Sequence, residues 1–476
     1  MRIKAKLMKA CLRVARSYSK SLIVIITLAT LAAATLLASA QQPASITMQQ
    51  GRLSPQGLYA IRNARIVTVS GPTIESGTVV IRDGKIEAVG AGVNVPSGAQ
   101  ELDATGLSVY PGMIDLGTSL GLVEVEAGAP GTVDLTEVGD MNPNAQAFFG
   151  INPHSAHVTV TRANGVTTVL SSPRGGIISG QAALINLDGT TPREMAVTPQ
   201  AALVITFPRA SAGGRRDFAT TPEAANTLTE AITTRDRQIE QLRKLLRDAE
   251  AYGKAQDAYA RDKSLPRPDQ NVVLSALAPY ARGERPVIMR ADREVEIRAA
   301  IRFAEEMRLK PPIIMGGNDA WKIASFLRER NVSVILTGVL DLPNREDDYY
   351  DQLYANAARL HEAGVRFAIS TGDTGAQVRD LPYHAGMAAA FGLPRDEALK
   401  AVTLYPAQIM GASDRLGSIE PGKLANLVVT DGDMLEARTH IRHLFIAGRS
   451  VSLANRQTEL YQQFKDRKIE GGSKLD

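Results

Sequence analysis

Cysteine is nearly absent from this 476-residue chain, and the single one, Cys11, lies close to the amino terminus. The remaining sequence can therefore form no internal disulfide and offers no thiol nucleophile or thiolate metal ligand. Histidine is also scarce, with six residues, and none of them forms an HxH or HExxH pattern. Those spacings place two imidazoles on one metal ion, so the commonest histidine metal motifs are excluded.

Acidic residues are missing from the first forty positions, which carry seven basic ones. An apolar run over 22–37 and the small residues Ala38-Ser39-Ala40 follow, the layout of a secretory signal peptide over 1–40. Cleavage after Ala40 predicts a periplasmic or secreted protein with no membrane contact. The alternative is an uncleaved membrane anchor, because the run approaches the ~18 residues that a span needs.

The apparent basicity of the chain comes from this leader. Without it, 47 basic residues face 50 acidic ones, a net charge of −3. Nothing in this balance points to nucleic acid or to an anionic membrane surface, so a small-molecule ligand is the expected partner.

Short strands and tight turns are expected near both ends of the remaining chain. Two β-rich runs, 59–69 and 78–89, flank Asp83-Gly84, a dipeptide typical of two-residue hairpins. Residues 416–429 and 444–451 have the same character. We therefore expect β structure from both termini.

Between these ends, short apolar runs alternate with helical patterns such as 295–308 and 321–330. This alternation predicts a parallel sheet built of βα units. The segment at about 214–268 departs from it, because its apolar residues recur every three or four positions over some forty residues. We expect a long helix or a helical hairpin inserted there.

The stretch Pro111-Gly112-Met113-Ile114-Asp115-Leu116-Gly117-Thr118-Ser119 resembles the first barrel strand of the amidohydrolase superfamily. The runs 381–399 and 417–423 look like the imidazolonepropionase-like branch. The resemblance implies an α/β fold, a (β/α)8 TIM-like barrel over 111–413 with a composite β-sandwich built from 41–110 and 414–476. It also implies a hydrolase that acts on carbon–nitrogen bonds.

The family's metal ligands are mostly replaced in this sequence. Gly117 and Ser119 stand at the two histidine positions of the first strand, Arg290 at that of the fifth, and Gly316 or Gly317 at that of the sixth. No lysine or glutamate fits the bridging position. A guanidinium repels a cation, so no metal cofactor is expected, and a single Zn or Mn ion is the alternative.

Asp373 is the one family functional residue that the resemblance carries over, as a ligand and general base after the last strand. His384 is the best-placed imidazole near it, which makes Asp373 and His384 the catalytic candidates. An Asx turn or helix cap is the structural alternative for Asp373. Substrate-binding candidates at strand ends are Arg174, Arg290, Asp292, Asn318 and Asp319.

Two hypotheses follow for function. The first is an exported hydrolase of carbon–nitrogen bonds that lacks the standard binuclear metal mechanism. The second is an inactive barrel, a pseudoenzyme, that binds a small ligand, forms a homo-oligomer or pairs with an active homologous subunit.

Overall fold

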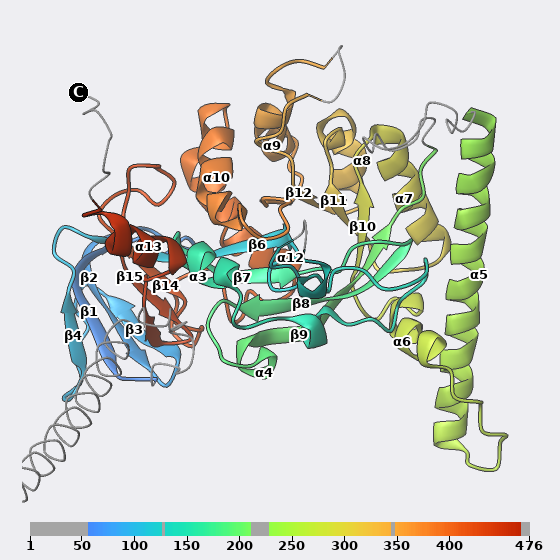
Figure 1. Cartoon of the computed structure of the whole chain (residues 1–476), viewed down its shortest axis with the longest axis horizontal. Helices are drawn as coiled ribbons and strands as arrows, with labels where there is room; N and C mark the ends of the chain where they lie inside the picture. The colour runs from blue at the N-terminus through green and yellow to red at the C-terminus, as the bar shows by residue number, and fades with distance from the viewer. Residues whose placement is uncertain (1–55, 126–128, 211–227, 344–347, 468–476) are drawn as a thin grey trace, which may run out of the picture. The chain divides into compact units, whose positions relative to one another are not determined.

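The computed structural model describes residues 56–125, 129–210, 228–343 and 348–467, which belong to one compact unit (Figure 1). The expected leader at 1–40 lies outside these residues. Within the described residues no helix combines the length and the apolar character needed to span a bilayer.

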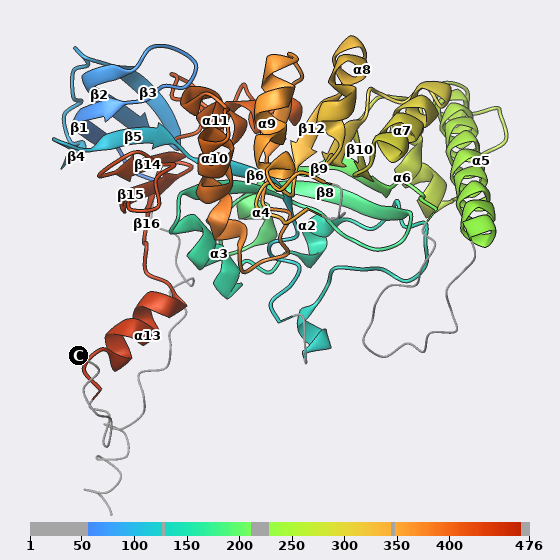
Figure 2. The same cartoon turned by 90° about the horizontal axis from the view of Figure 1, so that it is seen from above.

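One eight-stranded sheet is assembled from both ends of the chain, as predicted (Figure 2). Its amino-terminal strands are β1 (Tyr59–Ile66), β2 (Ile74–Arg82), β3 (Lys85–Gly90), β4 (Gln100–Asp103) and β5 (Ser108–Pro111). Its carboxyl-terminal strands are β14 (Leu427–Thr430), β15 (Ile441–Ile446) and β16 (Arg449–Val451). The two groups join where β5 pairs antiparallel with β14.

The hairpin between β2 and β3 confirms the Asp83-Gly84 prediction. Both residues have positive φ, 48° and 83°. Such a two-residue turn matches the right-handed twist of the strands that it joins.

The second sheet forms the barrel, with its eight strands in sequence order from β6 to β13. They are β6 (Met113–Thr118), β7 (Val166–Ser171), β8 (Ile178–Asn186), β9 (Ala196–Thr206), β10 (Val287–Ala291), β11 (Ile313–Gly316), β12 (Ser333–Leu336) and β13 (Phe367–Ile369). At the seam the Leu116 amide donates to Ser370 Oγ at 3.1 Å. Asp115, fully buried, accepts hydrogen bonds from the amide and hydroxyl of Thr371. These contacts hold the first and last strands together in a nearly closed barrel.

The expectation of a purely parallel sheet is wrong at one strand. β8 runs antiparallel to both β7 and β9. Only residues 172–177 connect β7 to β8, whereas a parallel connection needs a crossover of a dozen or more residues. The chain therefore turns back as a hairpin.

Helices cover the outside of the barrel (Figures 1 and 2). They include α3 (Ala156–Arg162), α4 (Pro192–Met195), α6 (Val272–Ala281), α7 (Glu294–Glu306), α8 (Ala324–Glu329), α9 (Gln352–Glu362), α10 (Leu381–Ala390), α11 (Arg395–Ala401) and α12 (Leu404–Ile409). A further helix, α13 (Arg456–Phe464), follows the last strand.

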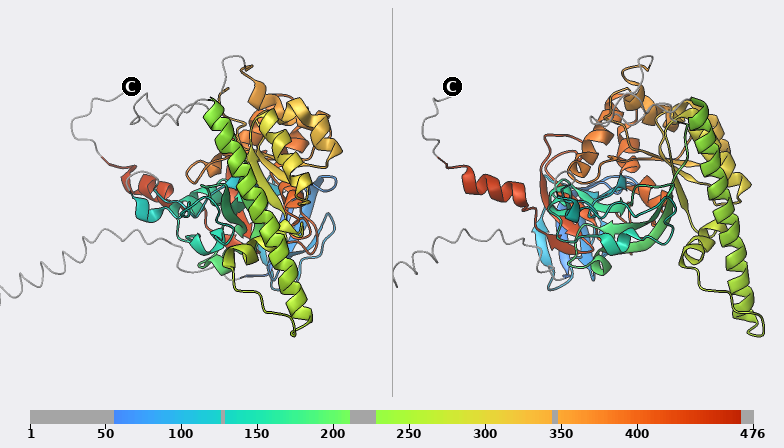
Figure 3. Two further views of the ribbon diagram at one scale, coloured as in Figure 1. Left: turned by 90° about the vertical axis from the view of Figure 1, so that its right-hand side faces the viewer. Right: turned by 45° about the vertical axis from the view of Figure 1, so that its right-hand side comes forward.

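The insertion forms one long helix, α5 (Leu228–Arg261), which runs along the side of the molecule (Figure 3) and packs on α6. Leu242 and Leu246 are its largest buried apolar residues, and Arg243 pairs with Glu306 of α7. The residues 211–227 that precede the helix lie outside the described part of the chain.

Side chains alternate in direction along the barrel strands, so the sheet separates a core beneath the helices from a core inside the barrel. On β10, Val287 and Met289 pack into the outer core beneath the helices, and Ile288 packs into the core inside the barrel. Because side chains two apart on a strand share a face, Arg290 has the same inward orientation as Ile288. Arg290 therefore belongs to the top of the barrel interior.

Candidate ligand site at the barrel mouth

Neighbouring groups surround Gly117 and Ser119 closely, at the two positions where the family's first barrel strand carries its histidine ligands. A Cβ atom at Gly117 would lie 2.8 Å from Thr337 Cγ2 and 2.9 Å from Ser370 Cβ. Ser119 is fully buried, and its hydroxyl donates to the Ser172 carbonyl at 2.7 Å. Neighbouring side chains thus fill the space into which a histidine at 117 would project.

The sixth-strand position is closed in a similar way. Gly316 has φ of 109°, and a Cβ there would meet Asp292 Oδ1 at 2.3 Å. Gly317 also has positive φ, and its Cβ would lie 2.7 Å from Val334 Cγ1. Any side chain at 316 would displace the Asp292 carboxylate and adopt a strained backbone conformation.

Two arginines meet at the mouth. Arg290 Nη2 donates to the Pro173 carbonyl at 3.2 Å, and Arg174 Nη2 donates to the Gly372 carbonyl at 2.8 Å. Burial, together with the Arg174 charge, lowers the pKa of Arg290 to about 10, so it remains protonated at neutral pH. Among the described residues no carboxylate forms an ion pair with Arg290. The pair therefore presents positive charge where the family places its cation.

Three other predicted residues gather in a separate pocket of about 290 Å³, which we call the acidic pocket. Its lining comes from the segments that follow β9, β10, β11 and β12: Arg209, Asp292, Arg293, Asn318, Asp319, Asp348, Gln352 and Leu353. Burial raises the pKa of Asp292, reinforced by Glu296 and opposed by Arg209. The five predicted substrate-binding residues are thus divided between an arginine pair and an acidic pocket.

Asp373 follows the last barrel strand and caps a turn. Its Oδ1 accepts hydrogen bonds from the amides of Gly375 at 2.8 Å and Gln377 at 3.1 Å. This is the geometry of the Asx-turn alternative. One carboxylate oxygen is therefore committed to local structure.

His384 lies on α10 and is 7% exposed. Burial lowers the pKa of His384 to about 4, and the charge of Asp373 partly opposes the shift. The ring is therefore neutral at physiological pH, and its buried Nδ1 has no hydrogen-bond partner among the described residues. The two catalytic candidates influence each other electrostatically, but no hydrogen bond joins them in the described structure.

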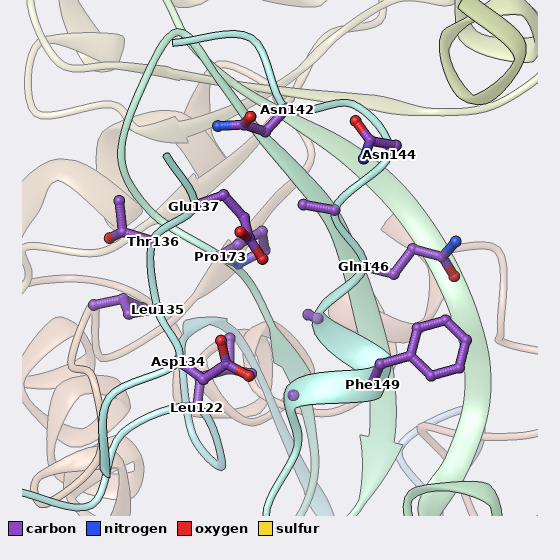
Figure 4. Close-up of a pocket in the computed structure, with 13 residues that line it drawn as sticks. Leu122, Asp134, Leu135, Thr136, Glu137, Asn142, Asn144, Gln146, Phe149 and Pro173 are labelled. Carbon is purple, nitrogen blue, oxygen red and sulfur yellow. The ribbon is translucent and has the colours of Figure 1, made fainter. Parts of the chain in front are cut away.

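A second pocket, of about 350 Å³, lies in the connection between β6 and α3 (Figure 4). Residues 134–137, including Asp134 and Glu137, line one side, and Asn142, Gln146 and Phe149 line the other. Pro173, whose carbonyl binds Arg290, also contributes. No motif marks this segment in the sequence. The signal that could have found it is the length of the connection, because long loops in compact domains are commonly functional.

The fold and the mouth define a barrel protein with a composite sheet, and the comparisons identify its relatives. The Amidohydrolase family model matches residues 321–471. An imidazolonepropionase of Syntrophobacter fumaroxidans is 38% identical over 82 residues, 17% of this chain and 19% of that protein. A putative N-acetylgalactosamine-6-phosphate deacetylase of Escherichia coli is 28% identical over 124 residues, 25% of this chain and 67% of that protein.

A solved amidohydrolase structure from Thermotoga maritima superposes with a TM-score of 0.72 at 25% identity, covering 83% of this chain and 99% of that one. Together, the family-model match, the curated relatives and the solved structure support the amidohydrolase superfamily. The match to the imidazolonepropionase spans only about a fifth of that relative's length.

The described residues do not fit the metal centre that is usual in this superfamily. Among them, no group of three or more histidine, cysteine, aspartate or glutamate side chains is arranged to hold a metal ion. Gly117 and Gly316 have no room for a ligand side chain, and Arg290 carries positive charge into the same region. We therefore derive no chemical step through a metal.

Acid should destabilise the fold through His384. Because its folded pKa lies near 4, below its ordinary 6.5, the unfolded chain binds more protons between these values. Its contribution to stability is complete above about pH 6.5 and decreases as the pH falls toward about 4. Urea unfolding across this range should show a smaller loss for His384→Leu. Equal slopes in the wild-type protein and in His384→Leu would contradict the expectation.

Proposed function

We propose that this chain is an exported protein of the amidohydrolase superfamily. Its barrel mouth binds a substrate that contains a carbon–nitrogen bond, and Arg290 and Arg174 hold the acidic group of that substrate. The observation that carries the proposal is the inward guanidinium of Arg290. It keeps its positive charge at neutral pH, and within the described residues it donates a hydrogen bond to the carbonyl of Pro173. A planar guanidinium with unused donors is well suited to a carboxylate or a phosphate.

The location of this charge supports the same reading. Ligands of barrel enzymes bind at the carboxyl ends of the strands, and Arg290 is the penultimate residue of β10. Arg174 lies in the turn after β7, at the same end of the barrel. We infer that the two guanidinium groups replace the electrostatic role of the metals in attracting an anionic substrate, without supplying a metal-bound nucleophile.

Export rests on the sequence of the leader. The carbon–nitrogen substrate class rests on superfamily membership and on the relatives matched, an imidazolonepropionase and a deacetylase. Recognition without hydrolysis, alone or beside an active homologous subunit, is the form of the proposal that best fits a mouth lacking a ligand set.

Hydrolysis without the standard binuclear centre is the second candidate. The specific observation in its favour is the neutral imidazole of His384, with its unpartnered Nδ1 and the charge of Asp373 nearby. A neutral imidazole can accept a proton from an attacking water. On this candidate, His384→Gln would abolish turnover and leave substrate binding intact.

The test separates binding from turnover in the mature protein, residues 41–476. Calorimetric titration with N-acetyl-L-alanine and with N-acetyl-L-alaninamide should show binding of the acid alone. Arg290→Gln should weaken that binding by about tenfold or more, the loss expected for one charge-assisted hydrogen bond. Arg285→Gln is the matched control, since Arg285 precedes the opposite end of β10 and bonds Gln200.

Metal content decides the remaining alternative. Elemental analysis before and after loading with zinc or manganese is paired with hydrolysis assays on N-acetyl amino acids, dipeptides and cyclic amides. Stoichiometric metal that is lost in Asp373→Ala, together with turnover, would overturn the proposal in favour of a metal hydrolase. Equal binding of acid and amide would also overturn it.

A further inference from the structure

The acidic pocket adjoins the arginine pair along a single strand. Asp292 follows Arg290 by two residues, at the carboxyl end of β10. The Cα atoms of residues two apart in the chain lie at most about 7 Å from each other. A site for negative charge and a site for positive charge are therefore adjacent within one mouth.

Asp292 is the carboxylate in this pocket that is least engaged by the protein. No hydrogen bond or ion pair to its carboxylate is found among the described residues. Its charged neighbours are mainly acidic, Glu296, Asp319 and Asp341, with Arg209 opposing them. By contrast, Asp319 is paired with Lys322 at 2.9 Å. A buried, acidic neighbourhood of this kind is relieved by an incoming cation.

Gln352 gives an independent indication of a ligand. It is 4% exposed and lines the acidic pocket, where it begins α9. Its side-chain amide makes no hydrogen bond within the described structure. Buried amides almost always have partners, so this one is available to a polar group that enters the pocket.

We propose that the acidic pocket binds the ammonium group of the same ligand whose acidic group is bound by Arg290 and Arg174. The inference rests on the proposed function, because it presupposes an anion on the arginine pair. The ligand is then a zwitterion whose charges are separated by roughly two residues, since an extended dipeptide spans at most about 7 Å. Amino-acid conjugates and dipeptides carry both charges, whereas N-acylated amino acids carry only the negative one.

The test uses three probes on the mature protein: L-alanyl-L-alanine, its N-acetyl derivative and its C-terminal amide. We expect the zwitterion to bind about tenfold more tightly than the N-acetyl acid, the gain of one charged contact. Asp292→Asn should remove this advantage and leave the affinity for the N-acetyl acid unchanged. Arg290→Gln should weaken binding of both acids.

Asp236→Asn, at an exposed position on α5, is the control and should preserve the wild-type order. Thermal melts of each variant establish that it is folded. If the N-acetyl acid binds and the zwitterion binds no better, or if Asp292→Asn keeps the tenfold preference, the acidic-pocket inference fails alone. If neither acid binds, the proposed function fails with it.

Discussion

Arg290→Met is expected to raise the free energy of unfolding by about 1–2 kcal/mol while weakening the binding of acidic ligands by about tenfold or more. The guanidinium lies at the top of the barrel interior beside Arg174, and burial with this like charge depresses its pKa to about 10. Replacing a poorly compensated buried charge by an apolar side chain of similar volume is commonly stabilising. A functional charge retained at the expense of stability gives this pattern.

Urea unfolding and calorimetric titration with N-acetyl-L-alanine measure the two effects. Arg285→Met serves as the control, because Arg285 bonds Gln200 at 2.7 Å and lies over the Tyr280 ring. We expect it to lose a little stability and to bind the ligand normally. A less stable Arg290→Met protein with unchanged binding would show that Arg290 is a structural residue.

Gly117→His should lower the free energy of unfolding by about 3 kcal/mol and should add no stoichiometric zinc. The new Cβ would already lie within 2.9 Å of two side chains, Thr337 and Ser370. Overpacking of this kind typically costs about 1–3 kcal/mol, and an imidazole extends further into the same space. Position 117 therefore lacks the family's histidine and also has no space for one.

Denaturant titration and elemental analysis after zinc loading test this expectation. Gly92→His is the matched control, because Gly92 is exposed and a Cβ there has no neighbour within 4 Å. Its stability should change by no more than about 0.5 kcal/mol. Tight zinc binding by Gly117→His would show that the mouth can still accept a ligand side chain.

Sequence patterns predicted the architecture well because the signals were local. The Asp83-Gly84 turn, the short strands near each terminus and the helix after β10 follow from short-range chemistry, and the structure confirms them. The joining of strands from the two termini in one sheet was implied by the family resemblance, and the structure confirms it as well. The orientation of β8 was missed, since a short apolar run in the sequence gives the same pattern whether the strand is parallel or antiparallel. The short 172–177 connection was the usable clue.

The site was predicted less completely. The arginines and the carboxylates after β10 and β11 were identified from their places at strand ends, but their separation into two groups depends on side-chain packing. The same holds for Gly316, because the Asp292 side chain that a Cβ at 316 would meet comes from the end of a neighbouring strand. Gln352 carried no sequence signal, because a glutamine at a helix start is ordinary until its burial is known.

The reversed direction of β8 has a consequence for how firmly Arg174 is held. A long crossover connection would leave the backbone around Arg174 with many accessible conformations. The six-residue link between two hydrogen-bonded strands instead anchors it at both sides, and its amide is fixed to the Leu135 carbonyl at 2.8 Å. Most of the entropy that an anion would otherwise have to remove is already lost when the barrel folds.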